Sequence, residues 1–210
     1  MKEDILEQLV EDWLQSKGYF TRANLKFKPD RKRTDYERRK DSVASDIDVI
    51  GFHPRLSDPE AVMVVGCKSW QDGFWVRDMV EALTTKQDKL VGNKEAWKHF
   101  RELVRDKWTD AFMSEIREKT GRNRFTYVTA VTVIGDPQNR QLWHTSQRFR
   151  AALRDNPIRL VTLREMLGEV FGQLGTTVES SQFSRTLQLL KAAGISLELH
   201  DTEPAISDDA

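Results

Sequence analysis

Two aspartates and a lysine of this chain have the types and spacing that phosphodiester chemistry uses. The segment "DIDVIGF" carries Asp46 and Asp48, and the apolar run "AVMVVGCKSW" stops at Lys68. Carboxylate oxygens are hard ligands that suit Mg²⁺, which takes one or two carboxylates and keeps several waters. A lysine beside such an ion can orient or deprotonate a water, or offset the charge on a phosphate. The residues therefore indicate metal-assisted phosphodiester hydrolysis.

The two segments read as neighbouring strands. Alternation in the first strand puts the two aspartates on one face and Ile47 and Val49 on the other. In the second strand, which is apolar on both faces like a central strand, Gly66 and Lys68 share one face. The short link between them, rich in turn residues, predicts an antiparallel hairpin. An acidic residue and the lysine can then meet at one end of a sheet.

On these residues the chain resembles the PD-(D/E)XK nuclease superfamily, most closely its Mrr-like, restriction-endonuclease-like members. The resemblance rests on a first helix with a glutamate, on "DIDVI" and on "CKSW", over about residues 3–75. The succession of helices and strands supports it to about residue 170. It implies a Mg²⁺- or Mn²⁺-dependent DNA endonuclease of the restriction, repair or defence type. Asp48 would match the metal-binding aspartate, Lys68 the catalytic lysine, and Cys67 would lend its backbone carbonyl to the metal.

Gly66 departs from the family pattern, which has glutamate or glutamine at this position. A glycine offers no side-chain ligand, so three explanations stay open. The carboxylate can come from elsewhere, the protein can bind nucleic acid without cutting it, or the glycine is a natural or engineered inactivating change. The residues that could supply the carboxylate are Asp72, Asp78, Glu81 and Asp46.

The first helix, predicted over residues 3–17, supplies one more acidic group. Glu7 lies at the edge of its apolar stripe and precedes Gly18 by eleven residues. The resemblance implies a glutamate here that touches the metal through water. The alternative is an ordinary exposed helix glutamate.

A basic segment and an aromatic residue are the candidates for contact with nucleic acid. Residues 26–40 contain eight basic and three acidic residues, which suits contact with phosphates. Trp70 and Gln71 follow Lys68 and could stack on a base or reach the cleft. The basic candidates are Lys28, Arg31, Lys32, Arg33, Arg38, Arg39 and Lys40. The alternatives are a solvated loop and a core tryptophan.

Composition describes a cytoplasmic globular protein. Apolar residues make up 39% and charged residues 31% of 210, and the net charge is zero. The acidic start "MKEDILEQLVEDW" is unlike a secretion signal, and no run of apolar residues is long enough for a membrane span. The one cysteine excludes an internal disulfide.

The order of elements predicts an α/β fold: a restriction-endonuclease-like three-layer core whose mixed central sheet is flanked by helices. Strands are expected near 19–27, 46–52, 61–70, 125–136 and 157–163. Helices are expected over 3–17, 74–90, 94–121, 139–155, 163–174 and 180–193. The nuclease domain would span 1–175 with a helical insertion at about 76–121. A helical appendage at 176–199 and a disordered acidic tail at 200–210 would follow.

Two other functions stay open. The chain could be a catalytically inactive member of the fold that acts as a DNA-binding or assembly module. It could also be a soluble interaction protein whose charged helices at 86–120 bind a partner. A homodimer would suit a nuclease that cuts both strands, although no interface is recognisable in the sequence.

Overall fold

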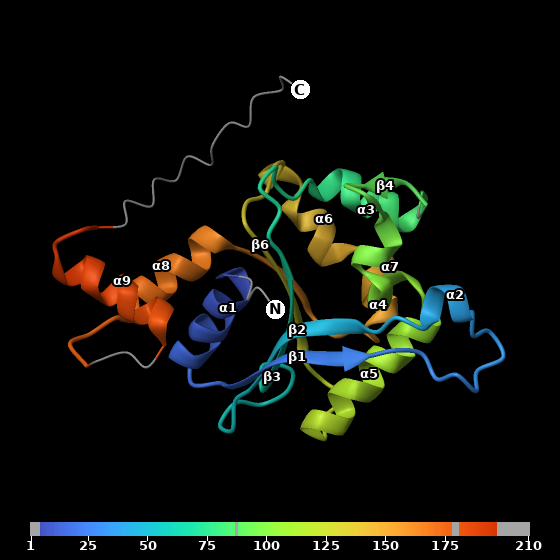
Figure 1. Ribbon diagram of the computed structural model, residues 1–210, viewed down its shortest axis with the longest axis horizontal. Helices are drawn as coiled ribbons and strands as arrows, with labels where there is room; N and C mark the ends of the chain where they lie inside the picture. Colours follow the sequence, from blue (N-terminus) through green and yellow to red (C-terminus); the bar gives the residue numbers. More distant parts are fainter. Residues whose placement is uncertain (1–4, 87, 178–180, 197–210) are drawn as a thin grey trace.

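A mixed five-stranded sheet forms the centre of the computed structural model, which describes residues 5–86, 88–177 and 181–196 (Figure 1). The sheet order is β1-β2-β3-β6-β7; β1, β2 and β3 pair antiparallel, whereas β3, β6 and β7 pair parallel. The strands are β1 (Phe20–Phe27), β2 (Ser45–Phe52), β3 (Val62–Lys68), β6 (Thr126–Val131) and β7 (Ile158–Thr162). The predicted α/β class with a mixed sheet is confirmed.

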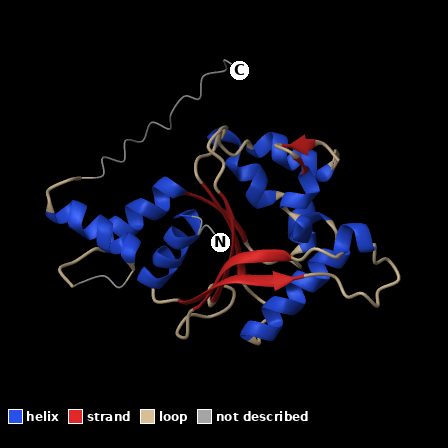
Figure 2. Cartoon of the chain, in the orientation of Figure 1, coloured by secondary structure: helices blue, strands red, loops and turns tan. Residues whose placement is uncertain are grey.

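Helices cover both faces of the sheet (Figure 2). One layer contains α1 (Ile5–Ser16), α8 (Leu163–Gln173) and α9 (Gln182–Ala192). The other contains α3 (Val76–Thr84), α4 (Arg101–Val104), α5 (Asp106–Thr120), α6 (Arg140–Thr145) and α7 (Gln147–Ala152). Each layer has its own apolar core, and burial of apolar area in both is the main driving force for this arrangement.

β3 lies at the centre because it is apolar on both faces. Val62 and Val64 enter the core beneath α3–α7, whereas Met63 and Val65 enter the core beneath α1. The same alternation directs Gly66 and Lys68 toward the α3–α7 layer. The predicted hairpin with β2 is confirmed by the antiparallel register, which runs from Phe52↔Val62 to Val49↔Val65.

The predicted alternation in β2 is wrong at one position. Ile47 packs in the α3–α7 core and Val49 in the α1 core, so the two do not share a face. The departure coincides with an irregular residue in the neighbouring strand β1, where Asn24 adopts a left-handed conformation with φ 58°. Ala23 pairs with Val49 and Leu25 pairs with Ile47, so Asn24 lies opposite Asp48. A residue in this conformation interrupts the regular pleat.

The predicted helix over 94–121 is broken into several elements. After α3 the chain forms the short hairpin β4 (Leu90–Val91) and β5 (Lys94–Glu95), then the 3₁₀ turn η1 (Ala96–His99), α4 and α5. The breaks lie at Phe100 and Arg105, whose backbones leave the helical region (φ −143°, ψ 54° and φ −127°, ψ 108°). Trp97, Phe100 and Trp108 are all buried, so packing of these rings favours the broken path over one straight helix.

Further along the chain, the predicted helix over 139–155 is also divided. Ser146 is extended and separates α6 from α7, and its side chain accepts a bond from the Phe149 N–H, which caps α7. β6 ends earlier than predicted, and a turn with η2 (Pro137–Asn139) follows. Thr162 and Glu165 form a capping box that begins α8 directly after β7.

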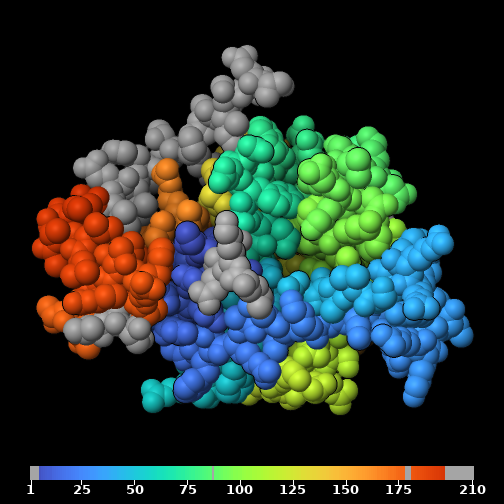
Figure 3. All heavy atoms as spheres, viewed as in Figure 1, coloured from blue at the N-terminus to red at the C-terminus, as the bar shows by residue number. Residues whose placement is uncertain are grey.

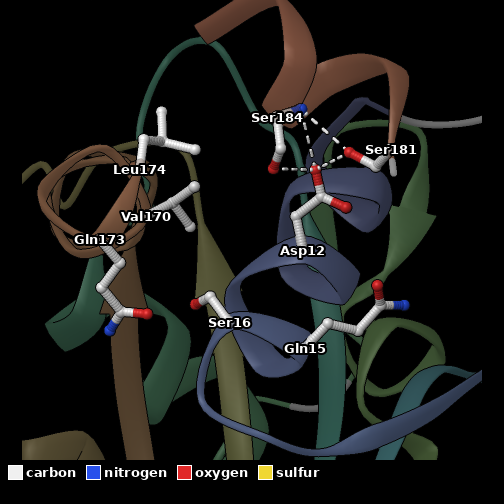
Figure 4. A pocket seen from close by; sticks show the side chains of 8 residues that line it. All are labelled: Asp12, Gln15, Ser16, Val170, Gln173, Leu174, Ser181 and Ser184. Carbon is white, nitrogen blue, oxygen red and sulfur yellow. Dashed lines mark hydrogen bonds between the residues drawn. The ribbon is translucent and has the colours of Figure 1, made fainter. Parts of the chain in front are cut away.

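α9 is docked onto α1 by a buried carboxylate. Asp12 accepts bonds from the Ser184 N–H at 3.1 Å, from the Ser184 hydroxyl at 2.7 Å and from the Ser181 hydroxyl (Figure 4). The bond from Ser184 gives a backbone N–H in the first turn of α9 an acceptor. A cavity of about 290 Å³ lies beside it, between α1, α8 and α9. The predicted tail at 200–210 lies outside the described residues. None of the helices in the described ranges is long and apolar enough to cross a membrane.

Candidate functional site

Asp48 is fixed where β2 and β3 stop pairing. The last pair is Val49↔Val65, and the same register would set Asp48 opposite Gly66. At this point the Asp48 carboxylate accepts a bond from the Cys67 N–H at 2.6 Å. The side chain is half-buried. The predicted carboxylate therefore lies beside the predicted lysine segment.

Lys68 ends β3 and is also half-buried. Its Nζ donates to the Cys67 carbonyl at 3.0 Å and stands 5.1 Å from the centre of the Phe100 ring. A cation over an aromatic face is stabilised by the ring quadrupole. Phe100 directly precedes α4, so the lysine is held between the end of β3 and the start of that helix.

The structure brings a third ionisable side chain to this place, Glu102 of α4. It is buried, and its Oε1 accepts a bond at 2.6 Å from the hydroxyl of Tyr127, which is on β6. The charges of both Lys68 and Asp48 act on this carboxyl group. The two predicted residues and Glu102 thus form one electrostatically connected group.

Burial dominates the protonation of this group. It raises the pKa of Glu102, although the bond from Tyr127 and the charge of Lys68 act in the opposite direction. Burial likewise raises the pKa of Tyr127, which keeps that hydroxyl a donor. A second cation near Glu102 would favour its ionised form.

The other acidic residues predicted for the site lie elsewhere. Asp46 is exposed and pairs with Lys26 on β1 at 2.5 Å. Glu7 is half-buried in the first turn of α1, on the opposite face of the sheet from Glu102 and Tyr127. Three further candidates are exposed around α3, namely Asp72, Asp78 and Glu81. Within the described residues, no group of three or more His, Cys, Asp or Glu side chains is arranged to hold a metal ion.

A basic arm, residues 28–44, joins β1 to β2 and stands out from the side of the molecule (Figure 3). It contains α2 (Arg38–Asp41). Its exposed basic side chains are those of Lys28, Arg31, Lys32, Arg38, Arg39 and Lys40. Arg33 is instead half-buried and pairs with Asp35 and Asp110, both at 2.9 Å.

The arm is tied to the helix that carries Glu102. Arg101 donates to the Val43 carbonyl at 3.2 Å, and its guanidinium lies 4.4 Å from the centre of the Trp108 ring. The arm then continues into β2 shortly before Asp48. Its basic side chains therefore belong to the segment that leads into the strand of the candidate carboxylate.

Trp70 is partly buried and not free to stack on a base with both faces. Its ring stacks on Phe74, with centroids 5.7 Å apart, and meets His99 edge-on at 5.2 Å. Together with exposed Gln71 it lines a cavity of about 530 Å³ that reaches the β4–β5 hairpin. Burial lowers the pKa of His99, and so favours a neutral ring in this wall.

Glu102 is the site residue that sequence reasoning missed. In one straight helix over 94–121, Glu102 would lie among the charged residues that face away from the apolar stripe. The break at Arg105 and the 3₁₀ turn before α4 change the direction of that face. The one sequence signal for such a residue is indirect: Gly66 leaves a lysine without the acidic partner that its setting requires.

Comparison of the chain with known protein families, with curated proteins and with solved structures finds no match. The fold and site define an α/β protein with a mixed sheet and a lysine–carboxylate group at the end of its central strand.

Proposed function

We propose that this protein is a metal-dependent nuclease that hydrolyses phosphodiester bonds in DNA, related to the PD-(D/E)XK superfamily that its motifs resemble. The observation that carries the proposal is the placement of Asp48 against the Cys67 N–H, one residue before Lys68. A carboxylate and a lysine are thereby held together at the end of a central strand. Such a pairing suits metal-assisted phosphodiester cleavage, in which a metal ion and a lysine can both stabilise the charge on the phosphate.

The donor chemistry at this strand end suits Mg²⁺ or Mn²⁺. Asp48 and the backbone carbonyl of Cys67 would hold the ion, since hard oxygen ligands suit both metals. When bound, it would act as a Lewis acid on a phosphate oxygen and lower the pKa of a bound water.

The chain's own residues position the reacting groups. The Cys67 N–H fixes the orientation of the Asp48 carboxylate. Lys68, held near Phe100, places a cation where the phosphate would gain negative charge, which is worth most in a partly desolvated site. The exposed cations of the basic arm would contact the phosphate backbone on either side.

Gly66 favours one second candidate, a nuclease-like protein that binds DNA without cutting it. With a glycine at this position, β3 itself brings no acidic ligand next to Lys68. The basic arm would give such a protein the same salt-sensitive affinity for DNA.

Cleavage of supercoiled plasmid DNA by the full chain tests the proposal. We expect nicking that requires Mg²⁺ or Mn²⁺ and disappears in Asp48→Asn and in Lys68→Ala. Lys191→Ala, on α9 across the sheet, is the matched control and should cut like wild type. If wild type binds DNA but fails to cut it with either metal, the second candidate replaces the nuclease.

A further inference from the structure

The strand position that lacks a carboxylate has room for one. A β-carbon at Gly66 would lie 3.7 Å from the Tyr127 hydroxyl and 3.9 Å from Lys68 Nζ, which are ordinary contact distances. The backbone there is not left-handed, so neither strain nor crowding requires a glycine. A side chain at 66 would point at the Tyr127 hydroxyl and the lysine ammonium.

Glu102 reaches the same hydroxyl from the helical layer above β3. Its carboxylate accepts from Tyr127 at 2.6 Å, so it contacts the same hydroxyl that a β-carbon at Gly66 would lie beside. A side chain at residue 66, on the sheet, and the Glu102 side chain, on α4, would therefore both lie near the Tyr127 hydroxyl. Only residue 102 brings a carboxylate to it.

The cost of burying Glu102 needs a compensating interaction. A buried carboxyl group is expensive unless it is hydrogen-bonded and, when ionised, paired with a cation. Tyr127 supplies the hydrogen bond, and the charges of Lys68 and Arg101 both interact with Glu102. Asp48 adds negative charge to the same space.

We propose that Glu102 supplies, from α4, the metal-binding carboxylate that β3 lacks at Gly66, and that Tyr127 holds it in position. This inference rests on the proposed nuclease function and completes its donor set with a second carboxylate. One or two carboxylates with carbonyl and water ligands are what Mg²⁺ takes. A hydrogen bond from a neighbouring hydroxyl is a usual way in which a ligating carboxylate is oriented.

The remaining acidic residues suit this role less well. Asp46 is paired with Lys26 on the exposed side of β1. Glu81 is paired with Lys86 at 2.7 Å on α3 and is exposed. Glu102 combines burial, a fixed orientation and electrostatic interaction with both Asp48 and Lys68.

Direct metal binding tests the inference without relying on cleavage. Mn²⁺ affinity of the full chain would be measured by calorimetry and by the loss of the free-ion paramagnetic resonance signal. We expect Glu102→Gln to weaken Mn²⁺ binding by about 10-fold or more, as loss of a ligand or its support does. Adding Gly66→Glu to Glu102→Gln should restore most of the affinity. Glu118→Gln, an exposed residue of α5, is the matched control and should bind like wild type.

The rescue separates a ligand from a structural residue. A glutamate that serves only packing would not be replaced by a carboxylate on another element. If Asp48→Asn abolishes Mn²⁺ binding and Glu102→Gln leaves it unchanged, the inference fails while the nuclease proposal stands. If wild type binds no Mn²⁺, both fail.

Tyr127→Phe is the second variant, for the case in which Glu102→Gln does not fold. It removes only the hydroxyl that holds Glu102. Weaker Mn²⁺ binding in the folded variant supports the inference, and unchanged binding would overturn it.

Discussion

The Asp48 carboxylate accepts a hydrogen bond from the Cys67 N–H at 2.6 Å, at the point where β2 and β3 cease to pair. The Asp48 side chain thus joins β2 to β3 beyond their last backbone pair, next to the segment that carries Lys68. A structural role and the proposed chemical role coincide in Asp48, so its substitutions must separate them.

We predict that Asp48→Ala lowers the free energy of unfolding by about 1–3 kcal/mol, because the Cys67 N–H loses its acceptor in a half-buried place. Asp48→Asn keeps a side-chain oxygen that can accept this bond, so its loss of stability should be smaller. Urea unfolding followed by circular dichroism measures both. Equal losses in the two variants would show that the bond to Cys67 does not stabilise the strand end.

The basic arm should depend on Asp41 for its position. The Asp41 side chain is fully buried, pairs with Lys107 at 2.7 Å and accepts from the Trp108 indole at 3.2 Å. We expect Asp41→Asn to cost about 3 kcal/mol, since it leaves Lys107 without its buried partner. Urea unfolding measures this cost, and limited proteolysis within 28–44 should become faster. Asp155→Asn, at an exposed carboxylate, should change neither.

The contribution of Asp41 should also depend on pH. Burial would raise its pKa, but the bonds from Lys107 and the Glu37 N–H prevail and lower it below the ordinary 3.8. A folded pKa below the unfolded one means stability that is present above pH 3.8 and diminishes as the pH falls further. The stability difference between wild type and Asp41→Asn should therefore shrink below about pH 3.8. A constant difference in urea titrations between about pH 7 and 3 would contradict this.

DNA binding by the arm should be electrostatic and carried by its exposed residues. We predict that Arg38→Ala with Arg39→Ala weakens binding and reduces the slope of log affinity against log salt. The slope should fall by about 0.9 for each phosphate that the protein no longer neutralises. Fluorescence anisotropy with labelled duplex at several salt concentrations measures the slope, with Lys191→Ala, on α9, as the control. An unchanged slope in the double variant would exclude these two residues from the interface.

The sheet could be predicted because its signals are local to each strand. β3 is apolar on both faces, and a strand with that pattern belongs in the centre of an α/β sheet. Asp48 and Lys68 could be placed near each other for the same reason, from a short link and a hairpin register. The face of Ile47 could not be predicted, since strict alternation is interrupted at Asp48, opposite the left-handed Asn24 of the partner strand.

Glu102, the remaining member of the candidate site, could not be predicted from the segment that carries it. Spacing of apolar residues over 94–121 fits one amphipathic helix, and in such a helix Glu102 lies among exposed charges. Large rings at Trp97, Phe100 and Trp108 pack better on a broken path, and this packing outweighs local helix propensity. Burial of Glu102 follows from that tertiary choice and from Tyr127 on a strand far along the chain.

The loop that follows Lys68 is held by a buried carboxylate. Asp136, from the turn after β6, accepts from the Val76 N–H at 2.6 Å and the Arg77 N–H at 3.0 Å, and so caps α3. We expect Asp136→Ala to cost about 1–2 kcal/mol, the usual cost of removing a helix cap. Urea unfolding measures this, with Asp155→Asn as an exposed control.

Asp136→Ala should also affect the candidate site. The turn after β6 is also joined to the loop by the Phe74 N–H, which donates to the Val133 carbonyl at 2.8 Å. Because this loop carries Trp70 and leaves β3 directly after Lys68, loosening it should lower plasmid cleavage by more than the fraction unfolded explains. If cleavage per folded molecule, measured below the unfolding transition, equals that of wild type, Asp136 supports only the helix and not the site.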